Sequence, residues 1–396
     1  MNRLWLAAVP ALLVGGLAVA LRPGVEAQQP PPASSPQPAP APVSVPEIPF
    51  DAATDVLKYS ADMNLGEVLG VAVNSKNRLV VLNHPGSPTQ GPLYGNASTQ
   101  LLEFDLGTGR FVREIGRNVY GLGYGHSIRF DKYDNLWVVD KGTNAVVKFN
   151  PAGFVTMNLG RRPEGPDDPE ESWFRNGRGG GPAPPPAQDG YFRGPTDIAF
   201  DSRDNLYVSD GYTNARVAKF DKRGAWVQSF GTRGTGGPRA DQNPGQLNTP
   251  HNIAVDRSDN VYVADRNNRR IQVFDADGTF RRFIFLNATY DKTHHPVLGN
   301  LAANPPDETQ PWTLCITGGS TQYLYSSDSE PGRIYKMTLD GRIIGTMGIS
   351  GRDTKQFNWV HALACPTDDT LYVADMNNWR IQKLTLHERT GRETAR

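Results

Sequence analysis

The sequence predicts an all-β protein, a six-bladed β-propeller closed by a strand from the N-terminal end of the chain. Six copies of one segment follow one another, and each has the short apolar stretches and turn residues of a four-stranded antiparallel sheet. β-branched and aromatic residues are plentiful in these copies, and long runs with a helical period are absent. Radial repetition lets such sheets bury both faces and protect their edges, so six sheets predict a propeller.

The repeated segment is clearest between His251 and Phe285. Its four expected strands are residues 251–256, 261–265, 270–275 and 280–285. The copies begin at Leu69, His126, Thr196, His251, about Pro311 and His361, and the expected second strands close at Asn83, Asp140, Asp210, Asp265, Asp328 and Asp375. The closing aspartates each end a strand ahead of a turn, where a carboxylate accepts backbone N–H groups, so we assign them to the scaffold.

The first residues resemble an export signal. A positive start at Arg3 precedes an apolar run from Leu4 to Leu21 and a small-residue exit at Ala27. We expect residues 1–27 to be a cleaved signal peptide and the protein to be periplasmic or extracellular. The run is nearly long enough to span a bilayer, so membrane contact is expected only if it stays uncleaved. Residues 28–46, rich in Pro, Ala and Ser, are expected to be an extended linker.

The propeller is expected over residues 47–388, with a polar tail at 389–396. The last copy has only three recognisable strands, so its fourth strand must come from elsewhere in the chain. Asp55–Tyr59 is expected to supply it and to close the ring. The stretch between Arg161 and Gly190, rich in Pro, Gly and charge, is expected to be a mobile surface loop rather than a substrate lid.

Composition restricts the partners. Lys and Arg number 41, Asp and Glu also number 41, and no basic stripe is present, which argues against nucleic acid. Cys315 and Cys365 occupy similar positions in the last two copies, and export would place them where disulfides persist. A disulfide and a pair of buried thiols both remain open, because matching repeat positions do not fix a Cα separation.

Three histidines predict a metal site. His126, His251 and His361 each stand fourteen residues ahead of a closing aspartate, in every second copy. Because the first strand of a propeller blade lines the central channel, the three imidazoles would converge on the axis. Three neutral imidazoles with one open position are typical of catalytic zinc, although copper, iron and nickel also accept such ligands. The competing interpretation is that each histidine fills the channel and bonds a backbone carbonyl.

Four more side chains are expected at the same mouth of the channel, since the end of each second strand lies beside the start of the first. His84, Lys141 and Arg266 directly follow the closing positions, and Tyr212 follows one residue later. A phenol beside a cation and a metal would have a lowered pKa, so Tyr212 is a candidate base, with a packing role as the alternative. Lys141 and Arg266 would favour an anionic substrate group. We take His84 and Lys141 as candidate substrate-binding residues.

Two resemblances follow from these residues. Asn252–Asp256 and Val261–Gln272 resemble NHL repeats, and that likeness extends from about Leu65 to Leu386. Within that group, the chain is similar to the catalytic core of the peptidyl-α-hydroxyglycine α-amidating lyases. The segments that carry this similarity are Gly194–Phe200, Val208–Arg216, Pro250–His251 and Ala264–Arg266. That family cleaves the C–N bond of a peptide ending in α-hydroxyglycine and releases a peptide amide and glyoxylate.

The resemblance implies zinc ligands at His126, His251 and His361, a base at Tyr212 and an active-site arginine at Arg266. His84 departs from the family, which has an arginine in its first blade. Ala362 stands where the family has an aspartate of a calcium site, so we do not expect that structural calcium.

We therefore expect a monomeric, zinc-dependent carbon–nitrogen lyase that acts on a peptidyl-α-hydroxyglycine-like substrate or on another small molecule or peptide. The alternative is a non-enzymatic NHL propeller that binds a protein or glycan partner at the channel mouth. A propeller hydrolase or lactonase fits less well, because such sites use carboxylate and amide ligands around calcium.

Overall fold

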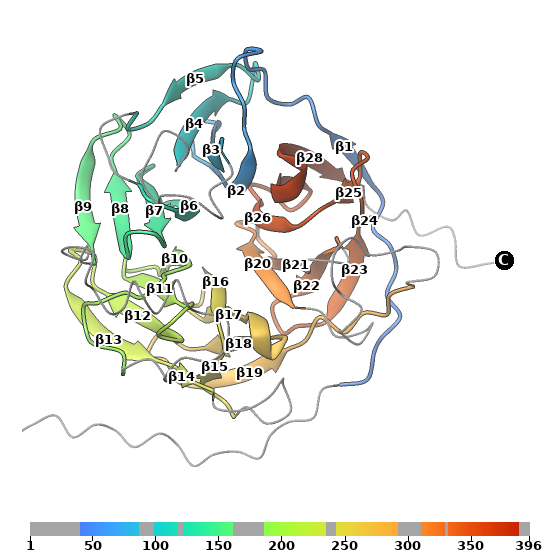
Figure 1. Ribbon diagram of the computed structural model, residues 1–396. Coiled ribbons are helices and arrows are strands. Elements are labelled where there is room, and N and C mark those ends of the chain that lie inside the picture. Colours follow the sequence, from blue (N-terminus) through green and yellow to red (C-terminus); the bar gives the residue numbers. More distant parts are fainter. Residues whose placement is uncertain are drawn as a thin grey trace, which may run out of the picture. The chain divides into compact units, whose positions relative to one another are not determined.

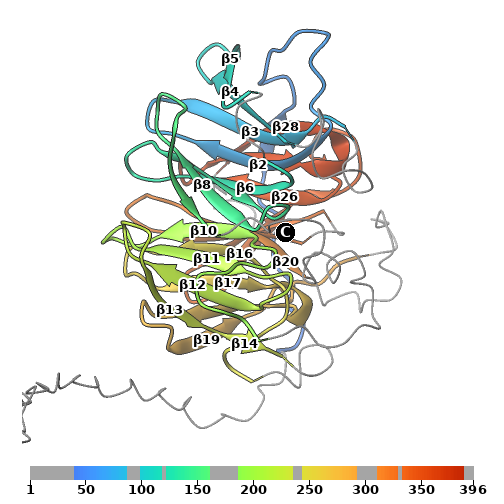
Figure 2. The same cartoon turned by 60° about the vertical axis from the view of Figure 1, so that its left-hand side comes forward.

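The computed structural model describes residues 40–86, 99–117, 122–160, 186–234, 243–291, 310–328 and 332–387. Within these residues, six four-stranded antiparallel sheets surround a central axis (Figures 1 and 2). The predicted six-bladed β-propeller is confirmed. No helix in the described ranges is long and apolar enough to cross a membrane. The expected signal peptide, the tail from residue 389 and residues 161–185 of the expected loop lie outside the described residues.

Each blade begins with the strand nearest the axis and ends with the outermost strand. Blade 1 contains β2 (Glu67–Val73), β3 (Arg78–His84), β4 (Gln100–Asp105) and β5 (Phe111–Glu114), and blade 2 contains β6 (Gly125–Phe130), β7 (Leu136–Asp140), β8 (Ala145–Phe149) and β9 (Val155–Leu159). Blade 3 contains β10 (Asp197–Phe200), β11 (Leu206–Asp210), β12 (Arg216–Phe220) and β13 (Trp226–Phe230). Blade 4 contains β16 (Pro250–Val255), β17 (Val261–Asp265), β18 (Arg270–Phe274) and β19 (Phe280–Ile284). Blade 5 contains β20 (Pro311–Ile316), β21 (Tyr323–Asp328), β22 (Ile334–Thr338) and β23 (Ile343–Met347), and blade 6 contains β26 (Val360–Ala364), β27 (Thr370–Asp375), β28 (Arg380–Leu386) and β1 (Phe50–Ala53).

The apolar core is divided among the spaces between neighbouring blades. Ile271 of blade 4, for example, shares one buried cluster with Leu314 and Tyr335 of blade 5. Because successive side chains of a strand point to opposite faces, a sheet with a neighbour on each side buries both. This accounts for the nearly unbroken apolar runs of the second strands, such as Leu136–Val139, all of which is buried.

The closing strand lies a few residues before the predicted one. Asp55–Tyr59 does not form it; β1 pairs with β28, with Phe50 opposite Leu386 and Ala53 opposite Lys383. Phe50 packs against the core between blades 5 and 6, and this packing selects the earlier segment. The predicted stretch instead turns toward blade 1, where Lys58 forms a bridge with Arg110.

The residues ahead of β1 follow the outer edges of the propeller. Val43 forms a parallel bridge with Ala288, just after blade 4, and Glu47 forms one with Thr346 in blade 5. Together with β1, this segment therefore touches three blades in succession. Part of the expected linker, from residue 43 onward, lies against the propeller.

Cys315 and Cys365 form a disulfide, which decides between the two alternatives left open by the sequence. Their Cα atoms are 6.1 Å apart, within the range that a disulfide requires. Cys315 lies in β20, and Cys365 follows the last residue of β26. The bond therefore joins the inner strand of blade 5 to that of blade 6.

Candidate metal centre

One position of the repeat lies near the start of each inner strand, or directly before that strand in blade 3. The strand registers make six residues equivalent in this respect, and they are Leu69, His126, Thr196, His251, Trp312 and His361. We call these the axis residues. Histidine occupies this position in the even-numbered blades and other residues occupy it in the odd-numbered blades, as the repeat pattern predicted.

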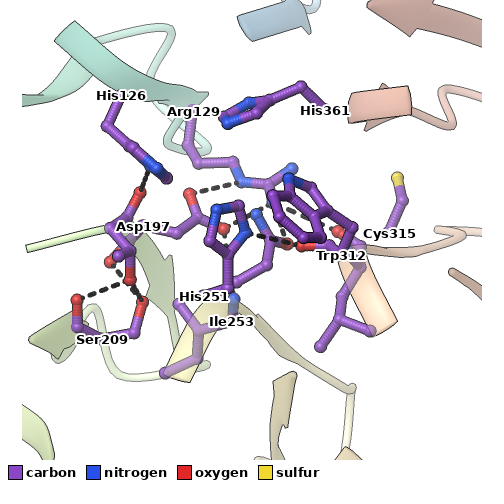
Figure 3. A network of polar contacts seen from close by, with 12 residues as sticks. His126, Arg129, Asp197, Ser209, His251, Ile253, Trp312, Cys315 and His361 are labelled. Carbon is purple, nitrogen blue, oxygen red and sulfur yellow. Dashed lines mark hydrogen bonds and ion pairs between the residues drawn. The ribbon is translucent and has the colours of Figure 1, made fainter. Parts of the chain in front are cut away.

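The three histidines meet in space (Figure 3). Each offers one ring nitrogen such that these atoms all lie within 4.8 Å of one another. The ring centroids of His126, His251 and His361 are 4.8 to 5.2 Å apart, and all three side chains are buried. Within the described part of the chain, no other group of three or more His, Cys, Asp or Glu side chains is arranged to hold a metal ion.

The other ring nitrogen of each histidine is held by the next blade. Nδ1 of His126 lies 2.6 Å from the carbonyl oxygen of Thr196, that of His251 lies 2.8 Å from Trp312 and that of His361 lies 2.7 Å from Leu69. A carbonyl only accepts, so each Nδ1 carries the proton and each Nε2 keeps its lone pair. The even blades thus supply the imidazoles, and the axis residues of the odd blades supply the carbonyls that orient them.

Burial keeps the three imidazoles neutral. It lowers the pKa of His126 and His251 well below 6.5, with neighbouring charges adding to the effect. Burial likewise lowers the pKa of His361 to about 3. Nε2 of His251 is buried and has no hydrogen-bond partner. A buried lone pair with no donor, beside the rings of two more histidines, fits a metal ion such as zinc. The bonds to backbone carbonyls, which the sequence offered as a competing interpretation, are compatible with a metal because they orient the rings.

Tyr212 lies against this cluster. It follows β11 on a loop, remains partly exposed, and its hydroxyl is 3.2 Å from Nε2 of His126. Nζ of Lys141 lies 4.5 Å from the centroid of the phenol ring, and Cζ of Arg266 lies 5.6 Å from it. Burial acts to raise the pKa of Tyr212, but the two cations outweigh it, so the pKa lies below 10.

Aromatic side chains that the sequence did not single out hold the two cations. Nζ of Lys141 lies 4.0 Å from the ring centroid of Tyr124, and Cζ of Arg266 lies 4.4 Å from that of Trp312. Trp312 also packs against His251, with ring centroids 4.7 Å apart, and against Trp359 at 4.8 Å. Its position in the repeat, equivalent to that of the histidines, is the signal that could have identified it.

His84 is placed differently from the other predicted residues. It is fully buried, and its Nε2 donates to the carbonyl of Gly125, 3.1 Å away. Its ring packs edge-on against Tyr124, with centroids 4.4 Å apart, and its Nδ1 lies 3.8 Å from a carboxylate oxygen of Glu67. His84 therefore lies in the wall of the mouth, and its role in binding a substrate stays a prediction.

The closing aspartates behave as scaffold. The carboxylate of Asp265, which is fully buried, accepts hydrogen bonds from the backbone of Asn248 and from the side chains of Asn268, Arg270 and Gln272. Each of these bonds ties the end of the second strand to a neighbouring segment. The carboxylate is thus fully engaged within its own blade.

Comparison with known proteins agrees with this architecture. The NHL repeat family matches residues 192–220 and 247–274. Peptidylglycine alpha-amidating monooxygenase of Rattus norvegicus is 27% identical over 344 residues, which are 82% of this chain and 31% of that protein. A probable peptidyl-alpha-hydroxyglycine alpha-amidating lyase of Caenorhabditis elegans is 22% identical over 346 residues, 83% of this chain and 85% of that protein. The chain is an NHL-repeat β-propeller homologous to the α-amidating lyases.

The chain spans about a third of the length of the rat protein and most of the nematode one. Among solved structures, the virginiamycin B lyase of Staphylococcus aureus aligns with a TM-score of 0.52 and 14% identity, covering 86% of this chain and 100% of that one. At that identity the likeness shows the fold alone. The homology to α-amidating lyases supports a lyase-like function in general.

Proposed function

We propose that this α-amidating lyase homologue is a metal-dependent carbon–nitrogen lyase that converts a peptidyl-α-hydroxyglycine-like substrate to an amide and glyoxylate. One observation carries the proposal: three buried, neutral imidazoles each offer a ring nitrogen within 4.8 Å of the other two, and a phenol with a lowered pKa lies beside them. A surface that only binds a partner needs neither a set of metal ligands nor a phenol with a lowered pKa. The imidazoles serve to donate electron pairs to a metal, and the phenol serves to transfer a proton.

His126, His251 and His361 would hold the metal, with zinc as the expected ion. When bound, zinc supplies a Lewis acid that polarises the hydroxyl or carboxylate oxygen of the substrate. The carbonyls of Thr196, Trp312 and Leu69 fix the three rings from behind, which keeps the ligand set in place without the ion.

Tyr212 would move the proton. As a phenolate, it takes the proton of the substrate hydroxyl, and the oxygen electrons then form the new C=O bond while the C–N bond breaks. The departing amide nitrogen takes the proton back from Tyr212, so the tyrosine ends as it began. The products are the peptide amide and glyoxylate, and no other reactant is required.

Lys141 and Arg266 would stabilise two negative charges, that of the Tyr212 phenolate and that of the substrate carboxylate. Both lie over the ring of Tyr212, and both remain partly exposed at the mouth. Two cations near a phenolate lower the free energy of the charged base, and the same cations attract the carboxylate of the substrate.

We also propose that the protein acts outside the cytoplasm, as a monomer. The disulfide between blades 5 and 6 supports the compartment, since such bonds persist in oxidising surroundings.

The test combines metal analysis with product detection. Purified protein is assayed by elemental analysis, and glyoxylate release from a synthetic peptidyl-α-hydroxyglycine is measured before and after chelation. We expect one bound metal ion per chain, and activity that is lost on chelation and restored by zinc. His251→Ala should lose both metal and activity, whereas His387→Ala, which changes an exposed histidine paired with Asp51, should keep both. A chain that binds no metal, or releases no glyoxylate when loaded, rules out this function.

A further inference from the structure

A single guanidinium crosses the channel beside the three histidines (Figure 3). Arg129 lies in β6, three residues after His126, and its side chain reaches from blade 2 to blades 3, 4 and 5. Its Nε and Nη2 donate to the two carboxylate oxygens of Asp197, at 3.2 and 2.7 Å. Nη2 also lies 2.9 Å from Oδ1 of Asn252 and 3.1 Å from the carbonyl oxygen of Leu314.

The contact of Arg129 with Asp197 in blade 3 supports the segment that orients His126. Asp197 directly follows Thr196, whose carbonyl accepts the Nδ1 proton of His126. The same carboxylate also accepts a hydrogen bond from the backbone N–H of Ile253 in blade 4, at 3.2 Å. Arg129 therefore fixes the segment that orients a histidine of its own blade.

The contacts of Arg129 with Asn252 in blade 4 and Leu314 in blade 5 support the segments around His251. Asn252 directly follows His251, and its Oδ1 also accepts the backbone N–H of Leu314, 2.7 Å away. Leu314 lies two residues after Trp312, whose carbonyl orients His251. The guanidinium thus holds both the segment that carries this ligand and the segment that aims it.

The ion pair between Arg129 and Asp197 occurs at only one of the six equivalent repeat positions. The residues that directly follow the axis residues are Gly70, Ser127, Asp197, Asn252, Thr313 and Ala362. Asp197 alone among them is ionisable, and its side chain is fully buried, whereas that of Arg129 is 19% exposed. Removing one member of such a pair leaves an uncompensated charge, and the surrounding groups must shift to solvate the other.

We propose that Arg129 is a positioning residue of the metal centre: by bridging Asp197, Asn252 and the carbonyl of Leu314, it sets the positions of His126 and His251. This rests on the metal site of the proposed function, but not on the reaction. It predicts that the affinity for metal depends on a side chain that does not itself touch the ion.

The experiment compares Arg129→Met with Arg282→Met. Arg282 is a matched control, because it also donates across a blade boundary, to the carbonyl of Leu339, but does so from the outermost strand of blade 4. Zinc affinity is measured by competition with a chromophoric chelator, and the absorption spectrum of the cobalt-loaded protein reports the ligand geometry. We expect Arg129→Met to weaken zinc binding about tenfold or more and to alter the cobalt spectrum, as supporting groups around metal ligands do. Arg282→Met should match the unmodified protein in both.

Three results would overturn the inference. These are zinc affinity within about twofold of the unmodified protein in Arg129→Met, an unchanged cobalt spectrum, and equal weakening in Arg282→Met. If Arg129→Met does not fold, Arg129→Lys is measured instead, since its ammonium keeps the charge beside Asp197 but loses the forked donors. Weakened binding in that variant supports the inference, and unchanged binding overturns it. A protein that binds zinc but releases no glyoxylate contradicts the proposed reaction and leaves this inference standing.

Discussion

Replacing Tyr212 by phenylalanine isolates the hydroxyl from everything else that the residue does. The ring contacts persist, including those to Lys141 at 4.5 Å and to His126 with centroids 5.5 Å apart. What is lost is the set of hydrogen bonds that the hydroxyl makes, among them those with Nε2 of His126 and with the side chain of Arg266. Neutral hydrogen bonds contribute about 1 kcal/mol each to stability and those to charged groups about 1.5 to 3 kcal/mol, so the free energy of unfolding should fall by about 1 to 3 kcal/mol.

Turnover should fall much further. A positioned acid or base contributes about 10² to 10⁴ in rate, which corresponds to about 3 to 5 kcal/mol at the transition state. We therefore expect kcat for glyoxylate release to fall by that factor, with metal content unchanged. Steady-state assays on the zinc-loaded variant measure kcat, and elemental analysis of the same sample measures the metal content.

Tyr262→Phe provides the matched control. Tyr262 is fully buried in blade 4, and its hydroxyl bonds a carboxylate oxygen of Asp256 and the carbonyl of Leu339. That variant should lose stability and keep its turnover. The reasoning is refuted if Tyr212→Phe, with full metal content, retains kcat within about threefold of the unmodified protein, well outside the range expected for an acid–base residue. Loss of the metal in Tyr212→Phe would equally contradict it, because the phenol would then serve the ion rather than the proton.

Four other perturbations have defined outcomes. Chelation should lower the melting temperature in calorimetry, because a metal present at a thousand times its Kd stabilises a fold by about 4 kcal/mol; an unchanged melting temperature would contradict a bound ion. A chain that begins at residue 54 loses β1 and the bridges formed by Val43 and Glu47, so its urea midpoint should fall; full burial of a phenylalanine side chain is worth about 1.5 to 3 kcal/mol, and the partly buried Phe50 should contribute less than that. Replacing Cys315 and Cys365 by serine opens a loop of 50 residues, for which chain entropy predicts a loss of about 4 kcal/mol in denaturant unfolding. Asp265→Ala leaves the buried Arg270 without its carboxylate and should destabilise the fold by about 3 to 5 kcal/mol, whereas the exposed Asp277→Ala should have little effect in the same measurement.

The fold was predictable because its signals are local. A four-strand pattern that recurs six times specifies both the sheet and the number of blades, and the second strands end where the closing residues predicted, within one residue. The closing strand was harder, because Phe50–Ala53 and Asp55–Tyr59 both lie beside the first blade in sequence. The choice between them was made by a core cluster that includes Tyr325, far along the chain.

The candidate site was predictable only in part. The histidines are marked by their common register, so convergence followed from the ring. Their orientation did not, since the carbonyl that holds His361 belongs to Leu69, 292 residues away. The roles of Tyr124 and Trp312 were also hidden, because an aromatic residue in a strand predicts only packing until its neighbours are known.

By itself, then, the sequence determined the strands of each sheet, the number of blades and the residue at each repeat position. It could do so because strand period and turn chemistry are properties of neighbouring residues. Only the tertiary structure decided which ring nitrogen of each imidazole bonds a backbone carbonyl, that Tyr124 and Trp312 pack against the cations beside Tyr212, and that Arg129 crosses the channel. These depend on closing the ring, which brings six inner strands within hydrogen-bond distance of one axis and lets each blade orient the side chains of the one before it.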